Sequence, residues 1–398
     1  MSDQRSDVES NDSEFLKLDL SALQQAATQC LDKPCSSISK LGEGAYHKVY
    51  LLTMQDGSEF IGRVAFPNYS RLKTESEVAT MLYLAEHTSI RVPKVYASNA
   101  DPENAVGAEY LMEKIPGAVI GRKEWAGMPI EKKEAILLQV IDIMLQLFQL
   151  NFEKIGCIFG GENGTYRIGT FIESAFFFDE RGAMDLDRGP WATAQEYLIA
   201  AIQREIDYLQ LFQSNLAANS QLFPRDLKPD STEIKKSFEN LAHMTPYICP
   251  SDPLLQRIAF KHIDLRLGNI MIEGDCVTGV IDWECAGCYP AWSCAAYPAW
   301  IMEEEEEEDE EAKEDSGQED PPSIGERTVA YLLSQSDDRT RSSFRESLRS
   351  RNTMPTVRKM GTLDLDMFQG ELDLAEYSPL SLSTSDETKT GSNKLGRG

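Results

Sequence analysis

The chain has 398 residues, of which 41% are hydrophobic, and this is enough for one large or two medium globular domains. Its formal net charge is −26, and residues 303–320 supply −12 of it with thirteen acidic residues and one lysine. Such acidity argues against nucleic acid and anionic membrane surfaces as partners, and no charge-free apolar run is long enough to cross a membrane.

The N-terminal segment, residues 1–14, is polar and acid-rich, and we expect it to be disordered. It has neither the apolar core of a secretion signal nor the Arg-rich, acid-poor character of a mitochondrial presequence. The eight cysteines are scattered, which suits a reducing compartment. We therefore expect the chain in the cytoplasm rather than in mitochondria.

Residues 15–115 predict five strands and one central helix. The strands are expected within 38–53, where a Gly-rich turn joins two of them, and at 60–66, 91–96 and 106–112. The helix is expected at 75–84. A further helical pattern over 18–30 is expected to pack on the same unit.

Gly42 and Gly44 lie in the turn between the first two strands. Glycines two residues apart let the backbone approach a ligand and turn its N–H groups toward phosphate oxygens, although a plain hairpin has the same pattern. Arg63 lies in the third strand, and Glu77 in the following helix reaches it if that helix face is buried rather than solvated. The pair would then orient a cation that binds phosphate.

Residues 116–302 predict a mainly helical unit, with helices at 129–152, 194–214 and 231–243 and a short hairpin over 155–169. The acidic segment 303–323 is expected to be a disordered insert, after which 324–350 would complete the unit with helices. Residues 351–398 are expected to be mostly disordered.

Residues 260–283 carry the most specific pattern, because they contain His262, Asp264, Asn269 and Asp282 around a predicted hairpin. Phosphoryl transfer requires a carboxylate that accepts the proton of the attacking hydroxyl, which suits Asp264. It also requires oxygen ligands for Mg2+, which suits Asn269 and Asp282. Each acidic residue alone would fit a surface hairpin, but the spacing of the set favours the catalytic interpretation.

Several stretches together resemble the aminoglycoside phosphotransferase family, within the protein-kinase-like fold that choline kinases share, and above all its large fungal branch. The matching segments are LGEGAYHKVYLLTMQDG, SEVATMLYL, RVPKVYA, VGAEYLMEKIPG, DRGPWATAQEYL, HIDLRLGNIMI and VIDWE, and they span about residues 35–300. The resemblance implies an α+β, protein-kinase-like fold of two lobes. Residues 15–115 would form a small, nucleotide-binding N-lobe of five antiparallel strands and one helix, and residues 116–302 a larger, mainly helical C-lobe with the catalytic and substrate-binding groups.

The resemblance also implies a role for each residue that matches the family's motifs. Asp264 would be the catalytic base, and Asn269 and Asp282 would bind Mg2+. Arg63, in place of the usual lysine, would contact the ATP phosphates and pair with Glu77. The other implied ATP-binding residues are Gly42 and Gly44 over the phosphates, Val49 against the adenine, and the hinge from Glu113 to Ile115. His47 replaces the third glycine of the loop, and His262 is expected to brace the catalytic loop.

Two functions are compatible with these residues. The first is an ATP- and Mg2+-dependent phosphotransferase that acts on a hydroxyl of a small molecule. The alternative is a catalytically weak or inactive, pseudokinase-like binding or scaffold protein, because arginine replaces lysine at position 63 and the acidic insert would suit a basic protein partner. A protein kinase is less favoured, since no long activation segment follows residues 281–283.

Overall fold

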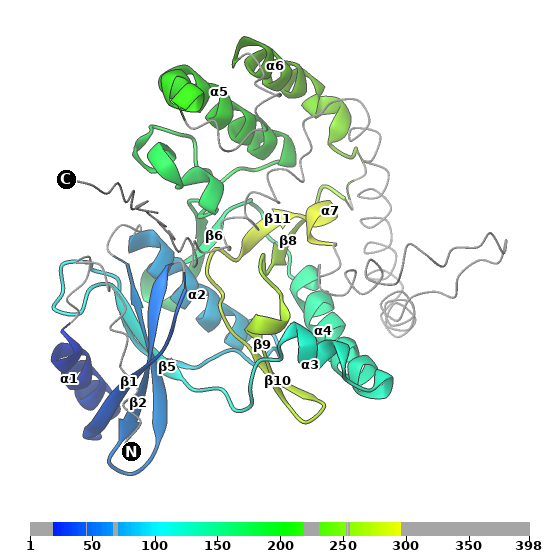
Figure 1. Ribbon diagram of the computed structural model, residues 1–398. Coiled ribbons are helices and arrows are strands. Elements are labelled where there is room, and N and C mark those ends of the chain that lie inside the picture. Colours follow the sequence, from blue (N-terminus) through cyan, green and yellow to red (C-terminus); the bar gives the residue numbers. More distant parts are fainter. Residues whose placement is uncertain are drawn as a thin grey trace, which may run out of the picture.

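The computed structural model describes residues 19–295, apart from residues 45, 67–70, 219–230, 252 and 254 (Figure 1). The expectations for residues 1–14, 303–323, 324–350 and 351–398 lie outside this described part.

One antiparallel sheet of five strands, in the order β1-β2-β3-β5-β4, forms the first lobe. The strands are β1 (Cys35–Glu43), β2 (His47–Met54), β3 (Glu59–Ala65), β4 (Val95–Asn99) and β5 (Glu109–Glu113). The predicted hairpin around the Gly-rich turn is confirmed. Strand β4 begins later than the sequence suggests, and Pro93 explains this, because proline has no N–H to donate to a strand ladder.

Two helices cover the two faces of this sheet (Figure 1). Helix α1 (Leu20–Leu31), predicted over 18–30, is capped by the Asp19 side chain, which accepts hydrogen bonds from the next backbone N–H groups. It packs on the face that carries Leu111. Helix α2 (Arg71–His87) packs on the other face, with Tyr110 and Met112, because side chains alternate along a strand.

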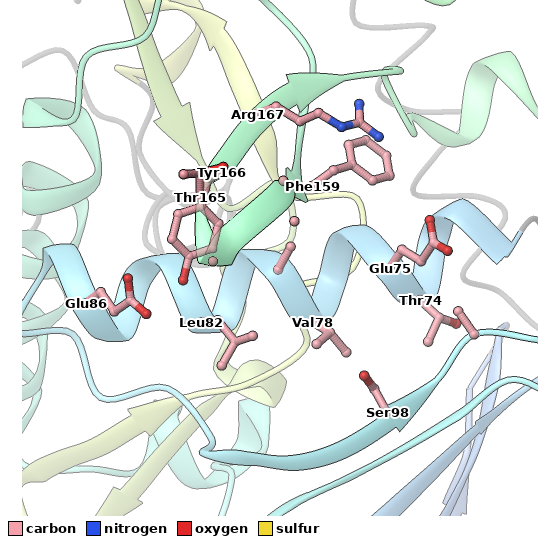
Figure 2. Close-up of a pocket in the computed structure, with 15 residues that line it drawn as sticks. Thr74, Glu75, Val78, Leu82, Glu86, Ser98, Phe159, Thr165, Tyr166 and Arg167 are labelled. Carbon is pink, nitrogen blue, oxygen red and sulfur yellow. The ribbon is translucent and has the colours of Figure 1, made fainter.

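Helix α2 is buried on most of its circumference. Its polar residues that are almost fully enclosed are Lys73, Thr74, Ser76, Glu77 and Thr80. The enclosure comes from a hairpin of the second lobe, β6 (Cys157–Gly160) and β7 (Tyr166–Gly169), which lies across the helix (Figure 2). The rings of Tyr83 and Tyr166 meet edge to face, with centroids 5.2 Å apart. The sheet and this hairpin therefore hold α2 between them.

The second lobe combines helices with three short strand pairs. Its helices are α3 (Arg122–Ala126), α4 (Ile130–Gln149), α5 (Ala194–Ala218), α6 (Ser231–Ile248) and α7 (Ala291–Cys294). The predicted helices at 129–152, 194–214 and 231–243 correspond to α4, α5 and α6. Strands β9 (Ile270–Glu273) and β10 (Cys276–Val280) form the hairpin predicted within residues 260–283. A further antiparallel pair, β8 (Ile258–Lys261) and β11 (Gly287–Pro290), was not expected from the sequence.

The chain crosses between the lobes at Gly117, and the backbone there leaves no room for a side chain. Gly117 has φ +95°, and a Cβ at this position would lie 2.6 Å from the carbonyl oxygen of Ile272. The next residue, Ala118, exchanges two backbone hydrogen bonds of 3.0 and 2.9 Å with Ile272. These contacts fix the crossing against the β9–β10 hairpin.

These elements confirm the predicted α+β, protein-kinase-like arrangement of a small antiparallel lobe and a larger, mainly helical lobe. The larger lobe contains more strand than expected. None of the helices in the described part of the chain combines the length and apolar character that a membrane crossing requires.

Candidate active site

Asp264 and Asn269 lie in the loop between β8 and β9, where a short helical turn brings their side chains together. The amide Nδ2 of Asn269 donates to Asp264 Oδ2 at 2.7 Å and to the Asp264 carbonyl at 2.9 Å. Arg266 Nε donates to the same Oδ2 at 2.9 Å. Burial raises the pKa of Asp264 above its ordinary value, and the charge of Arg266 opposes that rise.

His262 braces this loop, as expected. The Asp264 backbone N–H donates to His262 Nδ1 at 3.2 Å, so the Nε2–H donates to the Ile281 carbonyl at 3.1 Å. The imidazole also packs on Trp283, with centroids 4.6 Å apart. Burial lowers the pKa of His262, which keeps the ring neutral and preserves this tautomer.

Asp282 follows the β9–β10 hairpin, and its backbone is left-handed, with φ +65°. Its Oδ1 accepts a hydrogen bond of 2.8 Å from Nη1 of Arg63, which reaches over from β3 in the first lobe. The same Nη1 lies 3.0 Å from Glu77 Oε1 on α2. The predicted Arg63–Glu77 pair is therefore present, and Arg63 joins it to the second lobe through Asp282.

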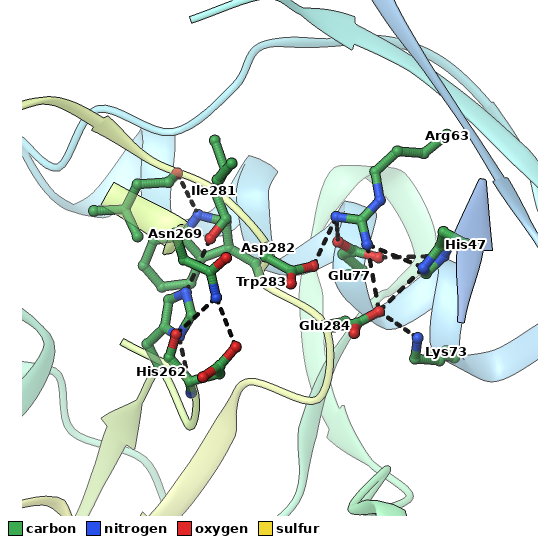
Figure 3. A network of polar contacts seen from close by, with 12 residues as sticks. His47, Arg63, Lys73, Glu77, His262, Asn269, Ile281, Asp282, Trp283 and Glu284 are labelled. Carbon is green, nitrogen blue, oxygen red and sulfur yellow. Dashed lines mark hydrogen bonds and ion pairs between the residues drawn. The ribbon is translucent and has the colours of Figure 1, made fainter. Parts of the chain in front are cut away.

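The second terminal nitrogen of the Arg63 guanidinium, Nη2, contacts two residues that were not predicted as site residues. Nη2 lies 3.0 Å from His47 Nδ1 and 3.4 Å from Glu284 Oε2. Lys73, one helical turn before Glu77, also contacts Glu284 Oε2. Figure 3 shows the side chains of His47, Glu77 and Glu284 around the guanidinium.

The ionisation of this network follows from its burial and its cations. Burial raises the pKa of Glu77 to about 7, although Arg63 opposes the rise. Burial also disfavours the charged form of Glu284, but Lys73, His47 and Arg63 outweigh it and hold the pKa of that carboxyl well below its usual range. Burial and the neighbouring Arg63 lower the pKa of His47 to about 3, so His47 is a neutral partner for the arginine.

The Asp264 loop and the Arg63 network are joined through residues 281–283. The Ile281 N–H donates to the Asn269 carbonyl at 2.9 Å, and Asp282 follows directly. In the view of Figure 3, Asn269 and Asp282 lie between His262 and Arg63. The amide nitrogen of Asn269 is committed to Asp264, while Asp282 Oδ2 makes no hydrogen bond to any described residue. The amide oxygen Oδ1 of Asn269 and the carboxylate oxygen Oδ2 of Asp282 therefore remain as donors. Both are oxygen ligands of the type that Mg2+ prefers, so these two residues fit this cation.

The expected nucleotide residues divide into two groups. A Cβ on Gly42 or Gly44 would meet no atom within 4 Å, so this strip borders open space, and Val49 pairs with Arg63 across β2 and β3. Glu113 and Ile115 lie apart from the polar network. The Glu113 side chain pairs with Arg91, and Ile115 is 3% exposed beside Gly279.

A separate cavity of about 490 Å3 lies between α2, β4 and the β6–β7 hairpin (Figure 2). Its lining includes Glu75, Val78, Phe159, Tyr166 and Arg167. It shares no residue with the Arg63 network or with the Asp264 loop, so it is distinct from the candidate active site.

Lys73 and Glu284 were missed as site residues because each is ordinary in its local sequence, and His47 was noted only as the residue at the third glycine position of the loop. Glu284 was visible only as the last letter of the VIDWE segment. The spacing of Lys73 and Glu77, four residues apart, places them on one helix face and was the available signal.

The chain is similar to one family model and to several known proteins. The model of the phosphotransferase enzyme family matches residues 37–326. A subtelomeric hrmA-associated cluster protein of Aspergillus fumigatus is 24% identical over 318 residues, covering 68% of this chain and 61% of the relative. Altered inheritance of mitochondria protein 9 of Yarrowia lipolytica is 27% identical over 274 residues, covering 60% of this chain and 46% of the relative. The chain therefore spans less than two thirds of the length of these relatives.

A solved ternary complex of the aminoglycoside phosphotransferase APH(2'')-IIa with streptomycin and ATP aligns with a TM-score of 0.49 at 11% identity, covering 90% of this chain and 96% of that one.

The expected cytoplasmic location is wrong on these comparisons. The Yarrowia lipolytica relative and those of Candida tropicalis and Candida albicans are named as mitochondrial proteins. The acid-rich N-terminal sequence had suggested the opposite, and composition near one end of a chain is a weak guide to its compartment.

The family model covers most of the chain and includes every residue of the Arg63 network and of the Asp264 loop; the chain belongs to the phosphotransferase enzyme family.

Proposed function

We propose that the chain is an ATP- and Mg2+-dependent phosphotransferase that acts on a hydroxyl of a small molecule. One observation carries the proposal. Residues 281–283 join three groups: the Asp264 carboxylate, which Asn269 holds; the oxygen donors of Asn269 and Asp282; and the guanidinium of Arg63. Charge neutralisation and positioning are the main requirements of phosphoryl transfer, and this set provides for both.

Asp264 is proposed as the base. Its Oδ2 is occupied by Asn269 and Arg266, which leaves Oδ1 to accept the proton of the acceptor hydroxyl. The hydroxyl oxygen attacks the terminal phosphorus of ATP, and ADP leaves. Bound by Asn269 and Asp282, Mg2+ would neutralise phosphate charge.

The proposed nucleotide site comprises Gly42, Gly44, Val49, Arg63 and Glu77, with adenine contacts from the backbone between Glu113 and Ile115. In this proposal residues 15–115 bind nucleotide and residues 116–302 carry catalysis and acceptor binding. The limits of these units, like the basic partner suggested for residues 303–323, stay predictions. The names of the yeast relatives support a mitochondrial location.

The test uses Mg·ATP and a panel of small hydroxylated metabolites, with ADP formation as the readout. Asp264→Asn should lower turnover by about 10²- to 10⁴-fold, the range expected for loss of a general base. Asp275→Asn, in the exposed turn of the β9–β10 hairpin, is the matched control and should leave turnover unchanged. Equal rates for the wild type and Asp264→Asn on every acceptor would refute the catalytic role.

A binding or scaffold function is separated from the enzyme by nucleotide-dependent stability. An enzyme of this design should gain melting temperature with Mg·ATP, and Asp282→Asn should abolish the gain that depends on Mg2+. A wild-type protein that shows no response to Mg·ATP favours the scaffold alternative.

A further inference from the structure

Lys73 occupies an unusual place for a lysine. It lies in the first turn of α2 and is 5% exposed, and its ammonium contacts Glu284 and lies 3.8 Å from the centroid of the Tyr46 ring. Tyr46 belongs to the turn between β1 and β2, two residues after Gly44. The ammonium therefore lies between the Tyr46 ring and the carboxylate of Glu284, and Figure 3 shows its contact with Glu284.

Lys73 and Arg63 approach the same atom. Glu284 Oε2 contacts the ammonium of Lys73 and lies 3.4 Å from Nη2 of Arg63. Two cations brought this close in a buried setting repel each other unless an anion lies between them, and the one carboxylate that contacts both is Glu284, while Asp282 and Glu77 contact Arg63. A phosphate chain carries more negative charge than one carboxylate, so it would be a better partner for both cations.

The two cations differ in freedom of movement. The Arg63 fork is held at both nitrogens, by Asp282 and Glu77 on one side and by His47 and Glu284 on the other. Lysine carries a compact charge on a flexible four-carbon stem and can change partners with a small movement of that stem. The chain thus pairs a fixed cation with a movable one.

We propose that Lys73 is a second phosphate-binding cation of the nucleotide site, and that Glu284 holds its ammonium until a nucleotide binds. The inference rests on the proposed function. A lysine ammonium is a compact point charge, whereas the guanidinium of Arg63 is planar and delocalised. The proposal assigns the compact charge to Lys73 on α2. The competing explanation is that Lys73 serves only to neutralise Glu284.

Calorimetric titration with Mg·ATP and with adenosine tests this assignment, because adenosine lacks phosphate. Lys73→Met should weaken Mg·ATP binding by about 10- to 100-fold, the equivalent of one charged hydrogen bond, and change adenosine binding by less than about 3-fold. Lys133→Met is the control, because Lys133 is also a buried lysine at an aromatic ring but belongs to α4. It should leave both affinities unchanged.

A double variant covers the case in which Lys73→Met fails to fold. Lys73→Met with Glu284→Gln removes both charges of the pair, and Glu284→Gln alone is its reference. If Lys73 binds phosphate, the double variant folds but still binds Mg·ATP at least about 10-fold more weakly than its reference. If Lys73 only neutralises Glu284, the double variant and the reference bind Mg·ATP equally, which overturns the assignment.

The outcomes separate this inference from the proposed function. Wild-type protein that binds neither adenosine nor Mg·ATP refutes the nucleotide site and the Lys73 assignment together. Wild-type protein that binds both, with an equal loss of both ligands in Lys73→Met or no loss at all, refutes only the assignment.

Discussion

Arg63→Lys is the substitution that most directly tests how the polar network is built. If the arginine were a decayed form of the family's lysine, restoring lysine would improve nucleotide binding. The contacts predict the opposite. An ammonium that replaces Nη1 keeps Asp282 and Glu77 but loses the contacts of Nη2 with His47 at 3.0 Å and Glu284 at 3.4 Å.

The loss amounts to about one hydrogen bond to a charged group, or about 1.5–3 kcal/mol of unfolding free energy. With an unfolding entropy of about 2.1 cal/mol/K per residue, each kcal/mol lowers the melting temperature of a chain of this size by about 1–2 °C, so we expect a decrease of about 2–6 °C. Thermal unfolding measured with and without Mg·ATP gives both quantities. We also expect a smaller stabilisation by Mg·ATP in the variant.

Arg71→Lys is the matched control, since Arg71 also pairs with a carboxylate, Glu75, but 64% of its side chain is exposed. It should leave the melting temperature nearly unchanged, as solvated ion pairs contribute little. A variant Arg63→Lys that is as stable as the wild type and binds Mg·ATP equally or more tightly would refute the fork geometry as the reason for arginine.

Two further predictions concern stability outside the network. Burial raises the pKa of Glu109 to about 7, and its Oε2 has no hydrogen-bond partner among the described residues. The folded state therefore favours the protonated acid. The contribution of Glu109 to the free energy of unfolding is full below pH 4.5 and is lost as pH rises through 7. Glu109→Gln should make the decline in melting temperature between about pH 4.5 and 8 smaller, leaving the part that Glu77 contributes in the same range, and an equal decline in the variant and the wild type would contradict the assignment. Gly117→Ala should cost about 2–4 kcal/mol in urea unfolding, because the left-handed backbone and the Ile272 carbonyl both oppose a Cβ; Gly121→Ala, where a Cβ meets no atom, should cost less than about 1 kcal/mol.

The sequence predicted those parts of the candidate site in which the functional residues lie close together in the chain. Asp264 and Asn269 are five residues apart, so one turn brings them into contact, and their spacing alone indicates the loop. The Arg63–Glu77 pair was also predictable, because a strand and the helix after it pack against each other. In both cases local geometry fixes the contact.

Contacts between residues far apart in the chain left no comparable signal in the local sequence. Lys73 and Glu284 are 211 residues apart, and each alone has the character of an ordinary surface charge. Strands β8 and β11 were missed for a related reason. Each has four residues and is largely buried, so the alternation that reveals a half-exposed strand is absent.

The enclosure of α2 between the sheet and the β6–β7 hairpin restricts how this protein can be regulated. A helix with one free side can pivot outward and carry its glutamate away from the arginine, which would switch the site off. Here Thr74, Ser76 and Thr80 are already covered, so a pivot would have to displace part of the opposite lobe. We therefore expect the Arg63–Glu77 contact to persist through turnover, and amide protons of α2 to exchange with solvent as slowly as those of the central strands.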